Sequence, residues 1–153
     1  MSSTPITHAS FTLERKLDAP VSRVWAAFSD YGNKKKWFHG PDEWTQGESS
    51  LDFREGGTET DTGGPEGGFV STMKSVYHDI VENERMVYTY EMYLNGERMS
   101  VSLSTIELES DGDSTRLTLT EQGAYFTAED HVEGRKEGTE GLLDALKAFV
   151  EGN

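Results

Sequence analysis

Alternation of apolar and polar residues dominates the chain between residues 44 and 122. In the segment 86–94, every second residue is methionine, tyrosine or leucine, so these side chains would share one face of a strand. The dipeptide Asn95-Gly96 follows directly and is typical of a two-residue type I′ hairpin turn. Further alternating runs, separated by turn residues, predict consecutive antiparallel strands.

A different periodicity precedes this region. The segment 11–17 alternates and predicts a half-buried strand. From Val21 to Phe28 the apolar residues follow the i, i+3, i+4, i+7 spacing of one helical face, directly after Pro20. The segment 34–39 then predicts a second short helix or a turn.

The C-terminal segment predicts a longer helix with glycines on its apolar face. Leucine, phenylalanine and valine residues between Leu142 and Val150 mark this face, and Gly134, Gly138 and Gly141 extend it towards the N-terminus. Each glycine inside a helix costs about 0.5–1 kcal/mol relative to alanine. Either the helix packs closely on a sheet, or it begins only at Thr139, or the glycines leave room for a ligand.

The alternation is interrupted at two places. The segment 56–68 is rich in glycine, which predicts a mobile loop or an irregular hairpin tip that could gate a pocket. In the strand after Asn95-Gly96, we expect Met99, Val101 and Leu103 to face inward. The apolar phase then slips to Ile106, so we expect a β-bulge near residues 104–105.

Length and composition predict one domain. The chain has 153 residues, which is enough for a single core, and we expect residues 1–9 to be a flexible lead-in and residues 10–153 to form the domain. It has no cysteine, no apolar run of the ~18 residues that would span a membrane, and no basic or apolar leader at its start. We therefore expect a cytoplasmic protein that does not insert into membranes.

The charge balance restricts the partners. The chain has 28 acidic and 14 basic residues and a net charge of −14. A surface this negative repels nucleic acid, which we therefore exclude as a partner. The basic cluster at residues 34–36 is expected to be solvated. The four histidines have no mutual spacing typical of ligands, so we expect no metal site.

Several segments in order carry a resemblance to a known family. They are Leu17–Phe28, Lys36–Phe38, Asp52–Gly57, Glu84–Thr89, Ser114–Glu121 and Gly138–Leu142. Together they resemble the AHSA1-like branch of the START-like, or SRPBCC, superfamily, which is named after the C-terminal domain of an activator of the Hsp90 ATPase. The resemblance covers roughly residues 10–150.

The resemblance implies an α+β helix-grip fold, in which a curved antiparallel sheet of about seven strands wraps a long C-terminal helix. One or two short helices follow the first strand. An apolar pocket would lie between sheet and helix. Members of the superfamily bind lipids, sterols, hormones and polyketides, and some are cyclases or aromatases. We therefore expect a cavity for a small hydrophobic ligand, such as a lipid, sterol, flavonoid or polyketide-like molecule, and no cofactor.

Two other functions stay open. One is an enzyme of cyclase, aromatase or hydrolase type acting in the same cavity. The other is a chaperone-related interaction module that would use Trp37, Phe38 and the 56–68 segment as its surface. An Hsp90-type chaperone is the weaker candidate partner, because the eukaryotic co-chaperone has an additional N-terminal domain. The chain could act as a monomer or a homodimer.

Glu121 is the weak catalytic candidate. It is in phase with Leu117 and Leu119, so it would point into the sheet's inner face, where burial would raise its pKa. Arg54 or Tyr125 could supply hydrogen bonds. Glu121 would then either tie the sheet end to a loop or act as a general acid or base.

The candidate ligand-binding residues combine inward-facing strand positions with the glycine face of the C-terminal helix. They are Trp37, Phe53, Met73, Tyr88, Tyr90, Met92, Val101, Leu103, Leu119, Glu121, Gly138 and Leu142.

Overall fold

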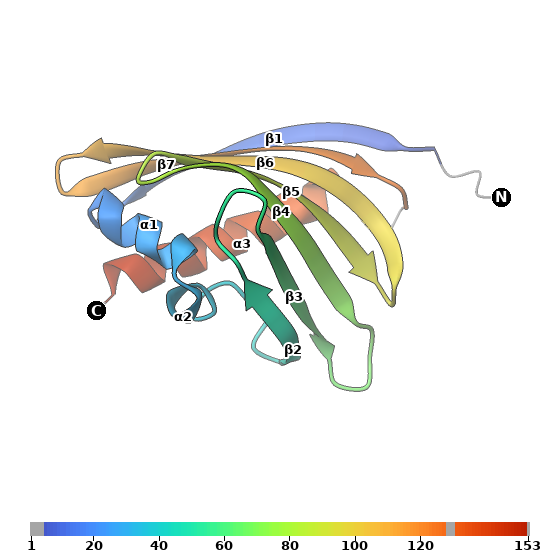
Figure 1. The fold of residues 1–153 in the computed structure, drawn as a ribbon. Helices are drawn as coiled ribbons and strands as arrows, with labels where there is room; N and C mark the ends of the chain where they lie inside the picture. The colour runs from blue at the N-terminus through green and yellow to red at the C-terminus, as the bar shows by residue number, and fades with distance from the viewer. Residues whose placement is uncertain (1–4, 128–130, 153) are drawn as a thin grey trace.

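A computed structural model describes residues 5–127 and 131–152 (Figure 1). Its seven strands form one antiparallel sheet in the order β1-β7-β6-β5-β4-β3-β2. The strands are β1 (Thr7–Leu17), β2 (Trp44–Leu51), β3 (Thr58–Pro65), β4 (Ser71–Val81), β5 (Arg85–Leu94), β6 (Glu97–Asp111) and β7 (Ser114–Tyr125). The helices are α1 (Val21–Ser29), α2 (Tyr31–Lys34) and α3 (Val132–Glu151).

The sheet arches over α3, and α1 and α2 lie beside the C-terminal half of that helix (Figure 1). Leu143, Leu146 and Val150 of α3 are buried in the core. Apolar residues of α1 and of the sheet's inner face complete this core, and burial of such side chains is the main stabilising contribution to the fold. The predicted helix-grip fold is confirmed.

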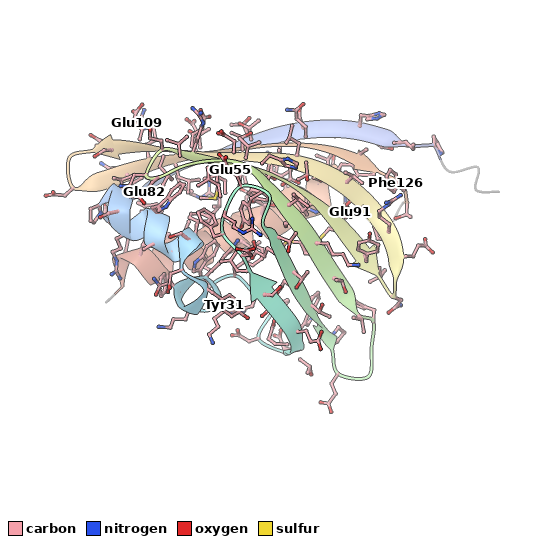
Figure 2. The ribbon with its side chains drawn as sticks, in the orientation of Figure 1. Tyr31, Glu55, Glu82, Glu91, Glu109 and Phe126 are labelled. Atoms are coloured by element: carbon pink, nitrogen blue, oxygen red, sulfur yellow. The ribbon has the colours of Figure 1, made fainter. Side chains whose placement is uncertain are left out.

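The outside of the molecule carries much of its acidic charge. Glu82, in the turn between β4 and β5, and Glu109, near the end of β6, are both exposed and are labelled in Figure 2. The described part of the chain has no helix that is both long and apolar enough to cross a membrane.

The turn at Asn95-Gly96 has the predicted geometry. Both residues have positive φ values, 52° and 83°, which a type I′ turn requires. Gly96 adopts this conformation at little steric cost. The turn sets the register of β5 and β6, from which several inner-face positions follow.

The β-bulge lies closer to this turn than the sequence indicated. Met92 pairs with Ser100 and Tyr93 with Arg98, so Met99 is the extra residue. From Ser100 the alternation then runs without interruption to Leu108. The expected bulge near residues 104–105 is therefore wrong, because three small serines, Ser100, Ser102 and Ser104, occupy inner-face positions where apolar residues were expected.

The glycine-rich segment 56–68 is largely a strand, and the prediction of a mobile loop or irregular tip is wrong. Residues 58–65 form β3, which pairs with β2 on one side and β4 on the other. A Cβ on Gly64 would overlap the carbonyl oxygen of Phe69. Glycine is used here because another backbone segment passes close by, and hydrogen bonds on both edges hold the strand.

Two element boundaries also differ from expectation. β1 begins at Thr7 and pairs with Tyr125 of β7, so residues 7–9 belong to the sheet and not to a flexible lead-in. α3 begins at Val132, where His131 Nδ1 accepts a hydrogen bond from the backbone N–H of Gly134. The explanation that the helix begins only at Thr139 is therefore excluded.

Candidate functional site

A cavity of about 560 Å³ lies between the inner face of the sheet, α3 and the segment that follows α2. Most of its lining is apolar or aromatic. Gly138 and Gly141 line it from α3, and a Cβ on either would meet no atom within 4 Å. These two glycines therefore face open space. Close packing of helix on sheet does not explain them.

Most of the residues selected from the sequence meet at this cavity. Its lining includes Trp37, Met73, Tyr88, Tyr90, Met92, Leu119, Glu121, Gly138 and Leu142. They come from β4, β5, β7, α3 and the segment after α2, and only the curvature of the sheet brings them together (Figure 1).

Three of the selected residues do not line the cavity. Phe53 packs in the core, where its ring centroid lies 5.6 Å from that of Trp25 and 5.0 Å from that of Tyr77. Val101 and Leu103 lie on the outer face of the sheet beside Gln122, and Leu103 is 37% exposed. The bulge at Met99 reverses the face of both residues.

Glu121 is buried, with 2% of its surface exposed, and both of its carboxylate oxygens are engaged. The hydroxyl of Tyr90 donates to Oε2 at 2.7 Å, and the hydroxyl of Ser104 donates to Oε1 at 2.9 Å. The guanidinium of Arg135 lies 3.6 Å from Oε2. A charge that is removed from water needs such partners.

Of the two partners proposed from the sequence, Arg54 lies elsewhere. Arg54 pairs with Asp52 at 2.9 Å on the surface. The ring of Tyr125 lies 5.5 Å from the guanidinium of Arg135 and so borders the polar group around Glu121.

Burial shifts the pKa values of Glu121 and Tyr90, which both line the cavity. Burial raises the pKa of Glu121, whereas the hydrogen bonds from Tyr90 and Ser104 and the charge of Arg135 act in the opposite direction. Burial and the neighbouring Glu121 raise the pKa of Tyr90 well above its ordinary value, although Arg135 opposes this. Tyr90 therefore remains a neutral hydroxyl that can donate to a carboxylate.

Arg135 is the main residue that sequence reasoning missed. Its guanidinium donates to the hydroxyls of Tyr90 at 2.9 Å, Ser100 at 2.9 Å and Ser102 at 3.3 Å. A signal was present, because Arg135 precedes Gly138 and Leu142 by one and two helical turns and so shares their face. A charged residue on an otherwise apolar face indicates a buried polar partner.

A second set of buried polar side chains lies at the side of the cavity next to α2. Lys34 is only 6% exposed, and its Nζ lies 2.7 Å from Glu59 Oε1. The hydroxyl of Tyr77 donates to the same oxygen at 2.6 Å. The expectation that residues 34–36 are a solvated cluster holds for Lys35 and Lys36 but is wrong for Lys34. The end of α2 points Lys34 inward over the ring of Phe38.

The described residues include no group of three or more histidine, aspartate or glutamate side chains that could hold a metal ion. The site is an apolar chamber that is bordered by polar groups around Glu121 and around Glu59 and by the carboxylate of Asp61. Such a chamber can enclose an apolar molecule and orient it through a few hydrogen bonds.

A curved sheet that grips a long helix around a chamber of this kind defines a protein of the START/SRPBCC-type fold. The sequence profile of the family described as "Activator of Hsp90 ATPase homolog 1-like protein" matches residues 18–151. The chain belongs to this AHSA1-like family, whose members commonly bind hydrophobic ligands.

Solved structures of similar proteins agree with this assignment. A Rhizobium leguminosarum protein is 36% identical, with 99% of this chain and 100% of that chain covered and a TM-score of 0.93. A Rhizobium loti protein is 41% identical, with 95% and 99% covered and a TM-score of 0.87.

An AHSA1-like protein from Aeromonas hydrophila shares the fold at 16% identity, with 94% and 92% covered and a TM-score of 0.70. A comparison with curated protein sequences finds no match.

Proposed function

We propose that the protein binds a small hydrophobic ligand in the cavity between the sheet and α3. The observation that carries this proposal is the open space in front of Gly138 and Gly141, within a chamber of about 560 Å³. Chambers of roughly 300–1,000 Å³ with apolar walls and few polar groups are typical of small-molecule sites. Helix glycines that cost stability without improving packing support a role in accommodating a ligand.

Affinity would come mainly from burial of apolar ligand surface, at ~25 cal/mol per Å². Tyr88, Tyr90 and Trp37 offer flat, adaptable walls for this purpose, and the two methionines Met73 and Met92 can adjust to ligands of different shape. The Tyr90 hydroxyl and the Glu121 group would orient a polar substituent. Lipids, sterols, flavonoids and polyketide-like aromatics are the classes to examine.

A thermal-shift screen of these classes tests the proposal. A ligand at about 100 times its dissociation constant stabilises by ~2.7 kcal/mol, which corresponds to a rise in Tm of roughly 5–10 °C for a domain of this size. Gly138→Leu fills the open space and should abolish the shift while the protein stays folded. Ala148→Leu is the matched control, because Ala148 is exposed on the same helix and lies away from the cavity.

A shift that survives Gly138→Leu, or the absence of any shift across the panel, would contradict a ligand in this cavity.

The second candidate, an enzyme of cyclase, aromatase or hydrolase type, is favoured by one observation. Glu121 lines the cavity beside Tyr90, and its pKa is raised by burial, as in many general acids and bases.

An interaction module is less well supported. Trp37 was expected on its surface, but this side chain is 3% exposed, and its ring N–H donates to the carbonyl of Ala27 at 2.9 Å. The 56–68 segment is mostly paired in β3.

A further inference from the structure

Asp61 places a carboxylate on the cavity wall without a directly bonded partner in the described part of the chain. It lies on β3, lines the cavity and is partly buried. Among the described residues, its carboxylate makes no hydrogen bond or ion pair. The lysine and arginine that line the same cavity are already matched, since Lys34 lies 2.7 Å from Glu59 and Arg135 lies 3.6 Å from Glu121. Asp61 is therefore the excess negative charge of this wall.

The side chains of Gln46 and Trp44 on β2 lie beside the part of β3 that follows Asp61. Gly63 follows Asp61 by two residues, so both face the cavity from the same side of β3. The indole of Trp44 lies over Gly63, with Cε3 only 3.7 Å from the position that a Cβ would occupy. The absence of a side chain at Gly63 leaves a space in the cavity wall that is lined by Asp61, Gln46 and Trp44, and the amide oxygen of Gln46 also lies 3.7 Å from that position.

The electrostatics of Asp61 also favour a cation. Burial and the neighbouring Glu59 raise the pKa of Asp61 to about 6, whereas Lys34 and His39 act in the opposite direction. Burial and Glu59 therefore disfavour the negative charge of Asp61. A cation placed beside it would stabilise the carboxylate, and the indole ring would add a cation–π contribution.

We propose that the ligand of this cavity is an amphipathic organic cation. Its ammonium group would lie between the carboxylate of Asp61 and the indole of Trp44, and its apolar part would lie beneath α3 in front of Gly138 and Gly141. This inference rests on the proposed function, and it names the chemical class of the ligand.

Titration calorimetry with three probes that share a decyl chain tests the inference. Decyltrimethylammonium is cationic, 1-decanol is neutral and decanoate is anionic. At neutral pH and low salt, the ammonium probe should bind about tenfold more tightly than decanol, and decanoate should bind more weakly than decanol.

Asp61→Asn should remove the preference for the ammonium probe while leaving the affinity for decanol unchanged. Asp144→Asn is the matched control, because it removes the same charge from an exposed position on α3 and should keep the preference. This pair separates a local contact from the general attraction of an acidic protein for cations.

If decanol binds but the ammonium probe binds no more tightly, or if the preference survives Asp61→Asn, the cation inference is overturned and the proposed function stands. If decanol binding also survives Gly138→Leu, the proposed function fails instead. Absence of binding by all three probes overturns the inference as well.

The wild-type protein offers an independent measurement in case Asp61→Asn does not fold. The charge of decyltrimethylammonium does not titrate, so its affinity should rise as the pH rises through about 6, where Asp61 ionises, while the affinity of decanol stays constant. Glu59, Lys34 and His39 are the charged or titratable groups that act on Asp61. His39→Asn should keep the pH dependence, and a flat profile in either protein would overturn the inference.

Discussion

Arg135 on α3 donates a hydrogen bond to the hydroxyl of Tyr90 on β5 across 2.9 Å. The same hydroxyl donates to Glu121 on β7, so a helix and two strands are joined by a continuous polar chain. Helix and sheet in a filled core would meet through apolar packing. Here a polar contact ties α3 to the sheet beside the open space in front of Gly138.

Arg135→Met should destabilise the protein by about 3 kcal/mol, because it leaves the buried carboxylate of Glu121 without a cation. Urea denaturation measures this loss. Adding Glu121→Gln to the same chain should restore most of it, since the neutral amide no longer needs the guanidinium. If the double variant loses as much stability as Arg135→Met and Glu121→Gln lose separately when their losses are added, the two residues are not coupled.

Glu121→Gln separates a binder from an enzyme. A ligand identified with the wild-type protein should bind the variant within about threefold, since the amide oxygen can accept from one of the hydroxyls of Tyr90 and Ser104 while the amide NH2 donates to the other. Product analysis after incubation gives the second readout. Turnover by the wild type that is lost in this variant, but kept in the exposed control Glu137→Gln, would establish acid–base chemistry at Glu121.

Lys34→Met should cost about 3–5 kcal/mol of stability, because Glu59 and Tyr77 then lose the cation buried between them. Lys35→Met changes the neighbouring exposed lysine and should alter stability by less than about 0.5 kcal/mol. Thermal and urea unfolding report both effects. Similar small changes in the two variants would show that the buried pair contributes little.

Asp61→Asn should change how stability depends on pH. Its native pKa of about 6 lies above the unfolded value of 3.8, so the folded protein binds more protons between these values and its unfolding free energy falls as the pH rises. The Asp61→Asn variant has no carboxyl group at this position, so its unfolding free energy does not fall in this way. It should be more stable than wild type by about 1 kcal/mol at neutral pH, after allowance for partial exposure, and equal to it below about pH 4. A constant difference across this range would contradict the assignment.

Two glycine substitutions should have opposite effects. Gly138→Ala should stabilise α3 by about 0.5–1 kcal/mol, because its Cβ enters open space and alanine is the better helix former. Gly64→Ala should destabilise by more than about 2 kcal/mol, because its Cβ overlaps a backbone oxygen that cannot move freely. Equilibrium unfolding of both variants checks the contrast between a cavity glycine and a packing glycine.

The candidate site was predictable where alternation is unbroken. Tyr88, Tyr90 and Met92 follow one another at every second residue, and Leu119 and Glu121 do the same on β7, so their inward direction follows from strand geometry alone. The prediction that Val101 and Leu103 face inward was wrong, because one extra residue, Met99, reverses the phase of β6. A hydrophobicity pattern does not reveal such a reversal when the inner-face residues are serines, because serine is polar.

Long-range pairing explains the other differences. Nothing in the local sequence shows that Lys34 meets Glu59 or that Arg135 meets Glu121, because each pair joins two different elements of the fold. In the same way, the glycines of β3 predict a loop when considered alone. They form a strand because β2 and β4 supply hydrogen-bond partners on both edges.

The order of strands and helices, the turn at Asn95-Gly96 and the apolar face of the last helix were determined by the sequence itself, because each depends on residues close together in the chain. The volume in front of Gly138, the partners of Glu121 and the lone charge of Asp61 were decided only by the tertiary structure. The curvature of the sheet and the register of its strands set the distances between these groups, and both arise from contacts between residues far apart in sequence.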